Sequence, residues 1–363
     1  MKLNAQNERI KHRYREFNKH ARQLGEQSLD ALAKALDRFE SHTGHRDFKE
    51  FRSEQAVSFK RRLAEQRSVR SNETLSKATI LATLNALRHF FEWLAGQPGY
   101  RSRLSYGDAE YFKASLKDTA IAKATREQRA PTIDQVRRVL AAMPSTGAIE
   151  RRDRALVAFA LLTGARDNAI ASLRLKHLDL AERQIFQDAN EVRTKFSKSF
   201  PTWFFPVGDD IEAIVAEWRG YLVELGFGPD DALFPQTATS LGPDGSFAVR
   251  LLSRQCWANA QPIRAIFKDA FEMAGLPYFN PHSFRNTLTQ LSMELCRTPA
   301  ELKAWSQNLG HEKVLTTLTS YGAIPAHRQR DLIRATAHSE DDDAKALRLG
   351  RDMLRTLRES GVQ

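Results

Sequence analysis

The sequence has very little cysteine and no long apolar run. Only two of its 363 residues are cysteines, Cys256 and Cys296, too few for a disulfide scaffold and too far apart for a CxxC zinc site. No run of about 18 apolar residues occurs, which argues against a membrane-spanning helix. Residues 1–26 contain no apolar core, so they do not read as a signal peptide. From these absences we expect a cytoplasmic protein.

Motifs for nucleotides, metals and serine nucleophiles are also missing. The sequence contains neither a GxxxxGK[ST] phosphate loop nor a GxSxG nucleophile turn. HEKVL begins like an HExxH zinc helix, but Leu315 stands where the second histidine would be. Without that i, i+4 pair there is no two-ligand face for zinc. We therefore expect no cofactor and no metal.

Positive charge is what the chain has in excess. Lys and Arg number 55 against 44 Asp and Glu, which gives a formal net charge of +11. This favours a polyanionic partner, nucleic acid first, although a merely basic soluble protein has the same composition. The length predicts two domains, and a hydrophobic content of 42% is enough for ordinary cores.

The first third of the chain has a helical pattern. Apolar residues spaced three and four apart predict helices in LDALAKALDRFESH and TILATLNALRHFFEWL, and QPGY stops the second. We expect a small helical bundle over residues 27–125. Residues 1–26, with seven Lys or Arg against three Glu, are either a flexible basic arm or the solvated start of a helix. Candidate DNA contacts of the bundle are Lys60, Arg61, Lys77 and Arg88.

A polar stretch that ends in Pro131 separates this bundle from a region of mixed elements. Thr132 and Gln135 fit a capping box at the start of a helix. RDRALVAFALLTG and PIRAIFKDAFEMAGL predict helices, and NPHSFRNTLTQLSMEL predicts one that begins with Asn280 as cap and Pro281 as first residue.

Strands are predicted only in RQIFQDANEVRTKFSKSFPTWFFPV, as two or three short ones joined by turns. The fold class that follows is mostly α with a small β-sheet, an α+β domain over residues 126–340. Residues 341–363 form a tail with an amphipathic segment.

Two arginines of this region call for an anion. In HSFR, His282 and Arg285 lie three apart in the first turn of a predicted helix, whose N-terminus adds partial positive charge. Such a pair suits a phosphate, although a surface histidine beside a salt-bridged arginine fits as well. Arg166 follows an apolar helix and a Thr-Gly break, and it needs an anion, water or a structural partner such as Asp153.

Two further signals are ambiguous when taken singly. Lys195 and Lys198 lie in RTKFSKS, at a predicted strand end and turn where most lysines are only solvated. In LGHEKVLTTLTSYG, His311 is followed by Tyr321, which shares a helical face with Leu318. The tyrosine is either a core aromatic or a nucleophile that other groups activate.

Taken in order along the chain, these segments resemble the tyrosine recombinase family, the phage-type integrases. The segments are LLTGARDNAIASLRL, TKFSK, PHSFRNT and LGHEKVLTTLTSY. The resemblance implies a core-binding domain over residues 27–125 and a catalytic domain over residues 126–340, together forming a clamp on duplex DNA. It implies a site-specific recombinase that cuts and rejoins DNA through a 3′-phosphotyrosine, without metal or ATP.

The resemblance also implies a role for each member of a six-residue set. These are Tyr321 as nucleophile, Arg166 and Arg285 as clamps on the phosphate oxygens, Lys195 as general acid for the leaving 5′-oxygen, His282 as an aid to proton transfer at the tyrosine, and His311 as a hydrogen-bond donor to the phosphate.

The chain departs from the family pattern in three places. Ala169 stands where the family usually has a glutamate, so something else must hold the arginine three residues before it. The spacing from His311 to Tyr321 is one residue longer than is common. The turn TKFSK lacks the usual glycine, which leaves Lys198 as an alternative to Lys195.

The implied partners are double-stranded DNA recombination sites, bound by a homo-tetramer, with accessory DNA-bending proteins left open. The C-terminal tail would pack either against a neighbouring subunit or against the subunit to which it belongs. Two alternatives remain at this point. One is a type IB topoisomerase-like enzyme or telomere resolvase, and the other is a catalytically inactive DNA-binding regulator on the same fold.

Overall fold

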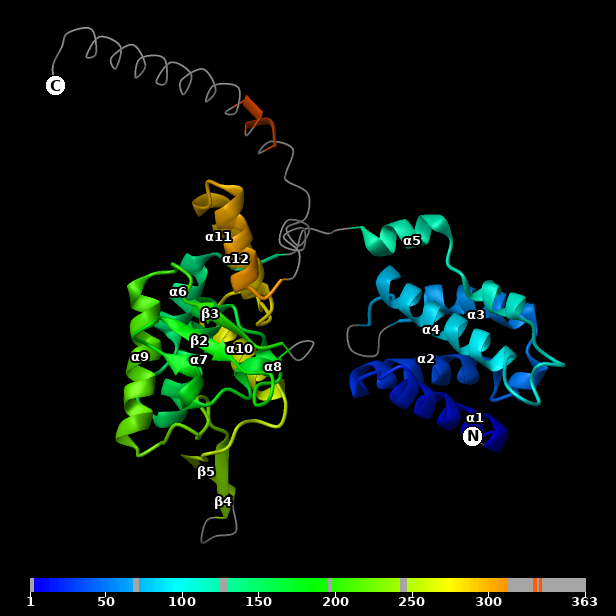
Figure 1. The fold of residues 1–363 in the computed structure, drawn as a ribbon, viewed down its shortest axis with the longest axis horizontal. Helices are drawn as coiled ribbons and strands as arrows, with labels where there is room; N and C mark the ends of the chain where they lie inside the picture. Colours follow the sequence, from blue (N-terminus) through cyan, green and yellow to red (C-terminus); the bar gives the residue numbers. More distant parts are fainter. Residues whose placement is uncertain are drawn as a thin grey trace, which may run out of the picture. The chain divides into compact units, whose positions relative to one another are not determined.

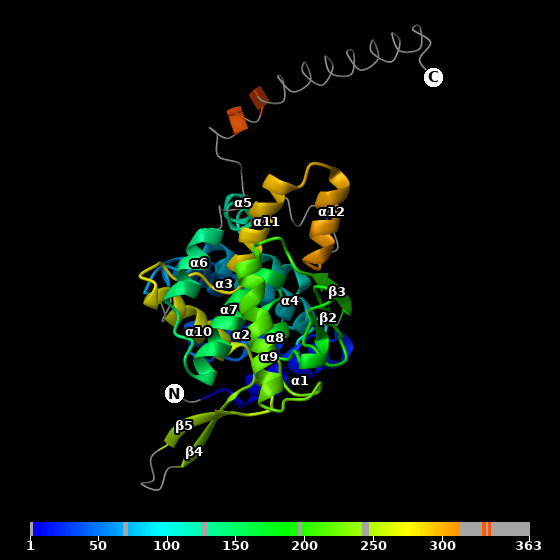
Figure 2. The same cartoon turned by 90° about the vertical axis from the view of Figure 1, so that its left-hand side faces the viewer.

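The computed structural model describes residues 3–67, 72–124, 129–194, 198–241, 247–311, 329–331 and 333–334. The chain divides into two compact units, Met1–Ala124 and Thr125–Gln363. Figures 1 and 2 show both, and each is described by itself. Among the helices in these ranges, none is both long and apolar enough to cross a bilayer.

The first unit is a helical bundle built around α4. Ser76 caps α4 by accepting a hydrogen bond from the Thr79 amide at 3.1 Å, and Gly96 ends it. The predicted apolar stripe of α4 is buried, with Leu87 and Phe90 fully enclosed. The elements of the unit are α1 (Ala5–Glu16) with a π-helical turn (Phe17–Ala21), α2 (Glu26–Thr43), α3 (Ser53–Glu65), α4 (Lys77–Ala95), α5 (Leu116–Lys123) and two 3₁₀ turns (Phe48–Glu50, Tyr106–Phe112).

The basic N-terminal segment belongs to the core of this unit. Ile10 and Tyr14 of α1 are buried in the same apolar cluster as α4. Asn7 is fully buried and donates to Glu40 Oε1 of α2 at 2.9 Å. The expectation of a flexible arm is therefore wrong for residues 5–21. The alternative, the solvated start of a helix, is what the structure contains, except that one face of α1 is buried by these apolar and polar contacts.

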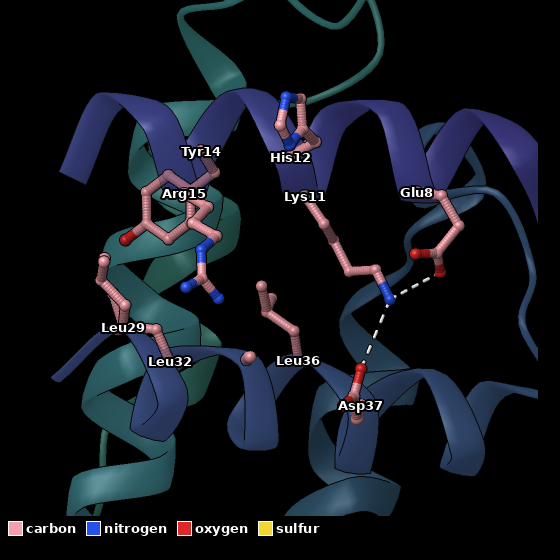
Figure 3. A pocket seen from close by; sticks show the side chains of 10 residues that line it. Glu8, Lys11, His12, Tyr14, Arg15, Leu29, Leu32, Leu36 and Asp37 are labelled. Atoms are coloured by element: carbon pink, nitrogen blue, oxygen red, sulfur yellow. Dashed lines mark hydrogen bonds and ion pairs between the residues drawn. The ribbon is translucent and has the colours of Figure 1, made fainter. Parts of the chain in front are cut away.

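Lys11 adds an ionic contact between α1 and α2. Its Nζ lies 2.5 Å from Glu40 Oε2 and 2.7 Å from Glu8 Oε1. Figure 3 shows it pointing from α1 toward Asp37, at a cavity of about 250 Å³ between the two helices. Burial opposes the ammonium charge, yet hydrogen bonds to Glu40 and Glu8 raise the pKa of Lys11 above its ordinary value.

The second unit is mostly helical with two small antiparallel sheets, which confirms the predicted fold class. The three-stranded sheet has the order β1-β2-β3, and β4 and β5 form a hairpin that projects from the unit (Figures 1 and 2). Its elements are α6 (Ile133–Ala142), α7 (Ala148–Thr163), α8 (Asp167–Ile170), a 3₁₀ turn (Leu175–His177), β1 (Leu178–Asp179), β2 (Gln184–Gln187), β3 (Phe200–Trp203), α9 (Asp209–Glu224), β4 (Thr237–Leu241), β5 (Phe247–Leu252), α10 (Gln261–Met273), α11 (Ser283–Leu295) and α12 (Pro299–Asn308).

Helix α7 forms the centre of the second unit. Its residues 155–163 are all buried, and it packs against α6, α9, α10 and α11. The predicted capping box at the start of α6 is present, because Thr132 Oγ1 accepts from the Gln135 amide at 3.1 Å and Gln135 Oε1 accepts from the Thr132 amide at 2.9 Å. A well-started α6 and a central α7 give the loop after α7 a fixed position.

Two features differ from the sequence-based expectations. The hairpin of β4 and β5 was not anticipated at all. Helix α11 begins at Ser283 rather than Pro281, because Asn280 and Pro281 form a preceding turn in which the Asn280 carbonyl oxygen accepts from the Ser283 hydroxyl at 2.6 Å. Asn280 still caps this turn, because its Oδ1 accepts from the Ser283 amide at 3.2 Å, and His282 is the residue directly before the helix.

Candidate active site

Arg285 lies at the centre of the site, on the first turn of α11. Its side chain is only 5% exposed. Nη1 donates to the Gly164 carbonyl at 2.6 Å, and Nη2 donates to the Leu309 carbonyl at 2.5 Å. Nη2 also lies 2.9 Å from His311 Nε2. One guanidinium thus joins the end of α7, the start of α11 and the segment after α12.

Two glycines allow the backbone to meet this guanidinium. Gly164 follows α7 with φ +59°, and a Cβ there would lie 2.9 Å from side-chain atoms of both Leu288 and Leu309. Gly310 has φ +68°, and a Cβ there would lie 2.7 Å from the ring of Phe200. Both positions require a left-handed backbone and close approach, which glycine alone accepts without strain. Each glycine therefore determines where a neighbouring carbonyl or histidine lies.

Arg166 supplies a second positive charge beside the first. It stands just before α8 and is half-buried, and burial lowers its pKa. Burial, with the charge of Arg166 as a second cause, lowers the pKa of Arg285 to about 9. The two guanidinium groups are thus close enough to repel each other in a partly dry environment.

No carboxylate within the described ranges pairs with either arginine. Asp153 Oδ1 lies 2.7 Å from Arg152 Nη2, so this carboxylate forms an ion pair with Arg152 and not with Arg166. Arg285 Nε is buried, and no described residue accepts from it. Two electrostatically coupled cations without a carboxylate, one of them with a donor to spare, would favour an anion as partner.

Asp167 takes part in fixing α8, where the family's usual glutamate is replaced by Ala169. Its Oδ2 accepts from Arg264 Nε of α10 at 2.8 Å, whereas the Ala169 side chain is buried in the core. The contact ties the residue after Arg166 to a neighbouring helix. The sequence alone did not reveal this contact, because Asp167 and Arg264 lie far apart in the chain.

His282 and Arg285 differ in their exposure to solvent. The histidine is exposed at the N-cap position of α11, while Arg285 three residues later is buried. The sequence predicted a side-by-side pair in one helical turn. The structure instead places an exposed imidazole and a buried guanidinium at the start of the same helix.

Of the six residues assigned by resemblance, four lie in the described part of the chain. Arg166, Arg285 and His311 come together, and His282 lies at the surface of the same helix start. Lys195 and Tyr321 lie outside the described residues. Lys198, the alternative lysine, is exposed between β2 and β3, two residues before β3 begins.

The basic candidates of the first unit are mostly engaged within that unit. Lys77 Nζ lies 2.7 Å from Asp118, and Arg88 Nε lies 3.1 Å from Glu92. Lys60 donates to the Lys113 carbonyl at 3.3 Å, whereas Arg61 is exposed on α3. In the described residues, no group of three or more His, Cys, Asp or Glu could hold a metal ion.

Comparisons with known proteins bear on the family and the fold of this chain. The sequence profile described as the phage integrase family matches residues 131–327. The tyrosine recombinase XerC of Xanthomonas axonopodis pv. citri (strain 306) is 25% identical over 243 residues, which are 67% of this chain and 67% of that protein.

Solved structures show the same fold at low identity. The lambda integrase dimer bound to a COC′ core site has a TM-score of 0.59 and 12% identity, covering 86% of this chain and 76% of its own. The Tn1549 transposon integrase in complex with transposon right end DNA has a TM-score of 0.59 and 15% identity, covering 90% of this chain and 99% of its own. The XerH recombinase bound to palindromic difH substrate has a TM-score of 0.57 and 18% identity, covering 90% and 84%. Because the family profile covers more than half of the sequence, this chain belongs to the phage integrase family, the tyrosine recombinases, and is an enzyme that cleaves and joins DNA strands.

Proposed function

We propose that this protein is a site-specific DNA recombinase that cuts and rejoins duplex DNA through a 3′-phosphotyrosine formed on Tyr321. The observation that carries the proposal is the arginine site. Arg285 is buried, Arg166 is half-buried and its charge helps to lower the pKa of Arg285, neither pairs with a carboxylate in the described residues, and Arg285 Nε has no acceptor there. A phosphate that both guanidinium groups contact would lower the free energy of such a site relative to its empty state.

The chemistry follows from which groups can carry a proton. Tyr321 Oη attacks the scissile phosphorus, the P–O5′ bond breaks, and the 5′-oxygen leaves with a proton from Lys195, or from Lys198 if that lysine is the acid. The phenolic proton passes toward His282 or water. A 5′-hydroxyl of the recombining strand later attacks the phosphotyrosine and frees the tyrosine.

Charge stabilisation in the transition state is assigned to fixed cations. Arg166 and Arg285 hold the non-bridging oxygens, and a guanidinium stays protonated over the working pH range, so its charge is dependable. His311 Nε2 can only accept from Arg285 Nη2, so its Nδ1–H would be the donor to the same phosphate. These groups supply the charge that a metal would otherwise provide, and the phosphotyrosine conserves the bond energy, so the reaction would need neither metal nor ATP.

The partner proposed is double-stranded DNA, held by both units. The related lambda integrase is described as a dimer on a core site and as a tetramer on a Holliday junction, and strand exchange between two duplexes by this chain would equally need four subunits. Arg61 is the best placed of the proposed phosphate contacts in the first unit because it is exposed. Lys60, Lys77 and Arg88 would have to exchange an internal contact for a phosphate.

The decisive experiment is covalent trapping. Nicked suicide duplexes that tile the DNA flanking the protein's own gene are incubated with the protein in EDTA and without ATP, then separated in detergent. Wild type should give a protein–DNA adduct on one tile. Tyr321→Phe should give none while binding the same tile within about twofold, because the phenyl ring keeps its shape but lacks the nucleophile.

The matched control is Tyr221→Phe, since this tyrosine belongs to α9 and its ring, which faces Arg151, remains. The control should form the adduct at the wild-type rate. An adduct from Tyr321→Phe would contradict the nucleophile assignment. Binding without any wild-type adduct would indicate a DNA-binding regulator, and supercoil relaxation without exchange between two sites would indicate a topoisomerase-like enzyme.

A further inference from the structure

Asn308, the last residue of α12, forms an unusual contact with the edge of the sheet. Its side-chain Oδ1 accepts from the Trp203 amide at 2.8 Å, and its Nδ2 donates to the Trp203 carbonyl at 2.9 Å. One carboxamide thus satisfies both peptide groups of a β3 residue, as a neighbouring strand would. Such a two-point contact fixes both the distance and the rotation of the helix end relative to the strand.

A second polar chain supports the same junction. The buried Thr202 hydroxyl donates to the Asn308 backbone carbonyl at 3.3 Å and accepts from Gln187 Nε2 of β2 at 3.0 Å. The end of α12 is therefore bonded to β3 through Trp203, and to β2 through Thr202. Any displacement of the hairpin formed by β2 and β3 would be transmitted to this helix end.

Only two residues separate Asn308 from His311, and both are fixed. Leu309 is buried, and Gly310 takes the left-handed conformation at a point where an added Cβ would lie 2.7 Å from the Phe200 ring of β3. The Gly310 amide donates to the Gln307 carbonyl at 2.7 Å, and the His311 amide donates to the Ser306 carbonyl at 3.1 Å, which closes the helix end. The position of Asn308 thus determines where Leu309 and His311 meet Arg285.

We propose that Asn308 is a positioning residue for DNA cleavage. Its carboxamide holds the end of α12 on β3, so that the Leu309 carbonyl and His311 reach the Arg285 guanidinium. It also ties β3, and through Thr202 β2, to the histidine segment. This inference rests on the proposed function, and it adds a residue that touches neither phosphate nor tyrosine.

Two substitutions separate the parts of the contact. Asn308→Ala removes both hydrogen bonds. Asn308→Asp keeps an acceptor for the Trp203 amide, but it places a second oxygen against the Trp203 carbonyl, where a donor is needed. Both variants should slow single-turnover adduct formation by roughly tenfold to a hundredfold, because small displacements of catalytic groups are costly, while DNA affinity changes by less than about twofold.

A double-mutant cycle with His311→Ala distinguishes positioning from general loosening. If Asn308 acts through His311, Asn308→Ala should slow the reaction little further in the His311→Ala background, so the two effects should not multiply. Hydrogen exchange supplies a reading that does not depend on activity. The Trp203 amide should exchange more than about tenfold faster in Asn308→Ala and remain slow in wild type.

Asn259→Ala is the matched control. It removes one side-chain acceptor, that of the Gln261 amide at 2.9 Å, at the start of α10, and it should leave both rate and Trp203 exchange unchanged. Wild-type rates in Asn308→Ala, or effects that multiply with His311→Ala, would overturn the positioning role alone. A wild type that forms no adduct would overturn the proposed function, and this role with it.

Discussion

Gly164→Ala tests the packing that holds the arginine site together. Gly164 has φ +59°, and its carbonyl accepts from Arg285 Nη1 at 2.6 Å. An added Cβ would lie 2.9 Å from Leu288 Cδ1 and 2.9 Å from Leu309 Cδ2. Leu309 is the residue whose carbonyl Arg285 also binds, so the new methyl group pushes on both backbone contacts of the guanidinium at once.

The loss of stability that we expect for Gly164→Ala has two parts. A left-handed backbone costs an alanine about 1–2 kcal/mol. Overpacking a well-filled core by one methyl group costs about 1–3 kcal/mol more. The free energy of unfolding should therefore fall by roughly 2–5 kcal/mol, which for a unit of this size corresponds to a Tm lower by roughly 5–15 °C.

Two other glycines separate these parts. Gly275 has φ +64°, but nothing lies within 4 Å of an added Cβ, so Gly275→Ala should cost only the backbone part, about 1–2 kcal/mol. Gly220 lies within α9 with open space around it, and Gly220→Ala should stabilise by about 0.5–1 kcal/mol.

Calorimetry and urea unfolding of the three variants provide the measurement, with adduct formation as a second reading. Gly164→Ala should slow cleavage beyond what its stability explains, because the Arg285 contacts shift. Should Gly164→Ala cost no more than Gly275→Ala, the close approach at the end of α7 does not constrain the site, and the reasoning about it fails.

Two further predictions concern charge. Inorganic phosphate at ten times its Kd should raise the stability of wild type by about 1.4 kcal/mol, and the Tm by roughly 3–6 °C, relative to chloride at equal ionic strength; an Arg166→Gln variant that responds equally would show that the arginine site binds no anion. Burial lowers the pKa of His177 below its ordinary 6.5 although Glu191 opposes this, so the unfolded chain takes up the proton first as pH falls. In urea unfolding, the contribution of neutral His177 to the free energy of unfolding should be fully present at about pH 7.5 and decline below about pH 6.5. His177→Asn keeps an acceptor for the Arg174 amide and should make that decline less steep. An equal slope in the variant would assign the acid sensitivity to other groups.

Local patterns in the sequence were sufficient for much of the second unit. The capping box at Thr132, the break at Gly164 and the apolar face of α10 each depend on residues within one turn of each other, so the sequence predicts them directly. The resemblance was needed to assign Arg166, Arg285 and His311 to one site, because they lie in three segments that are far apart in the sequence.

Other features had no signal of that kind. The junction of Asn308 with Trp203 depends on tertiary contact between residues about a hundred positions apart, and an asparagine at a helix end has many other uses. The buried face of the basic N-terminal helix had no such signal either, because charge dominates the composition of the segment, while the few residues that fix α1, such as Asn7 and Tyr14, are buried by α2 and α4. Tertiary contacts decided both cases, and no short window of sequence contains them.

The junction at β3 also has a consequence for how copies of this protein meet one another. β3 is the last strand of its sheet, and an exposed strand edge is a template for unwanted pairing. In an antiparallel strand, the backbone N–H and C=O groups of successive residues point alternately to either side, and those of Pro201 and Trp203 point away from β2. Proline has no amide hydrogen, and the Trp203 amide already donates to Asn308. This edge therefore offers an incoming strand no donor at either position, so pairing of a second copy of this protein along β3 is disfavoured.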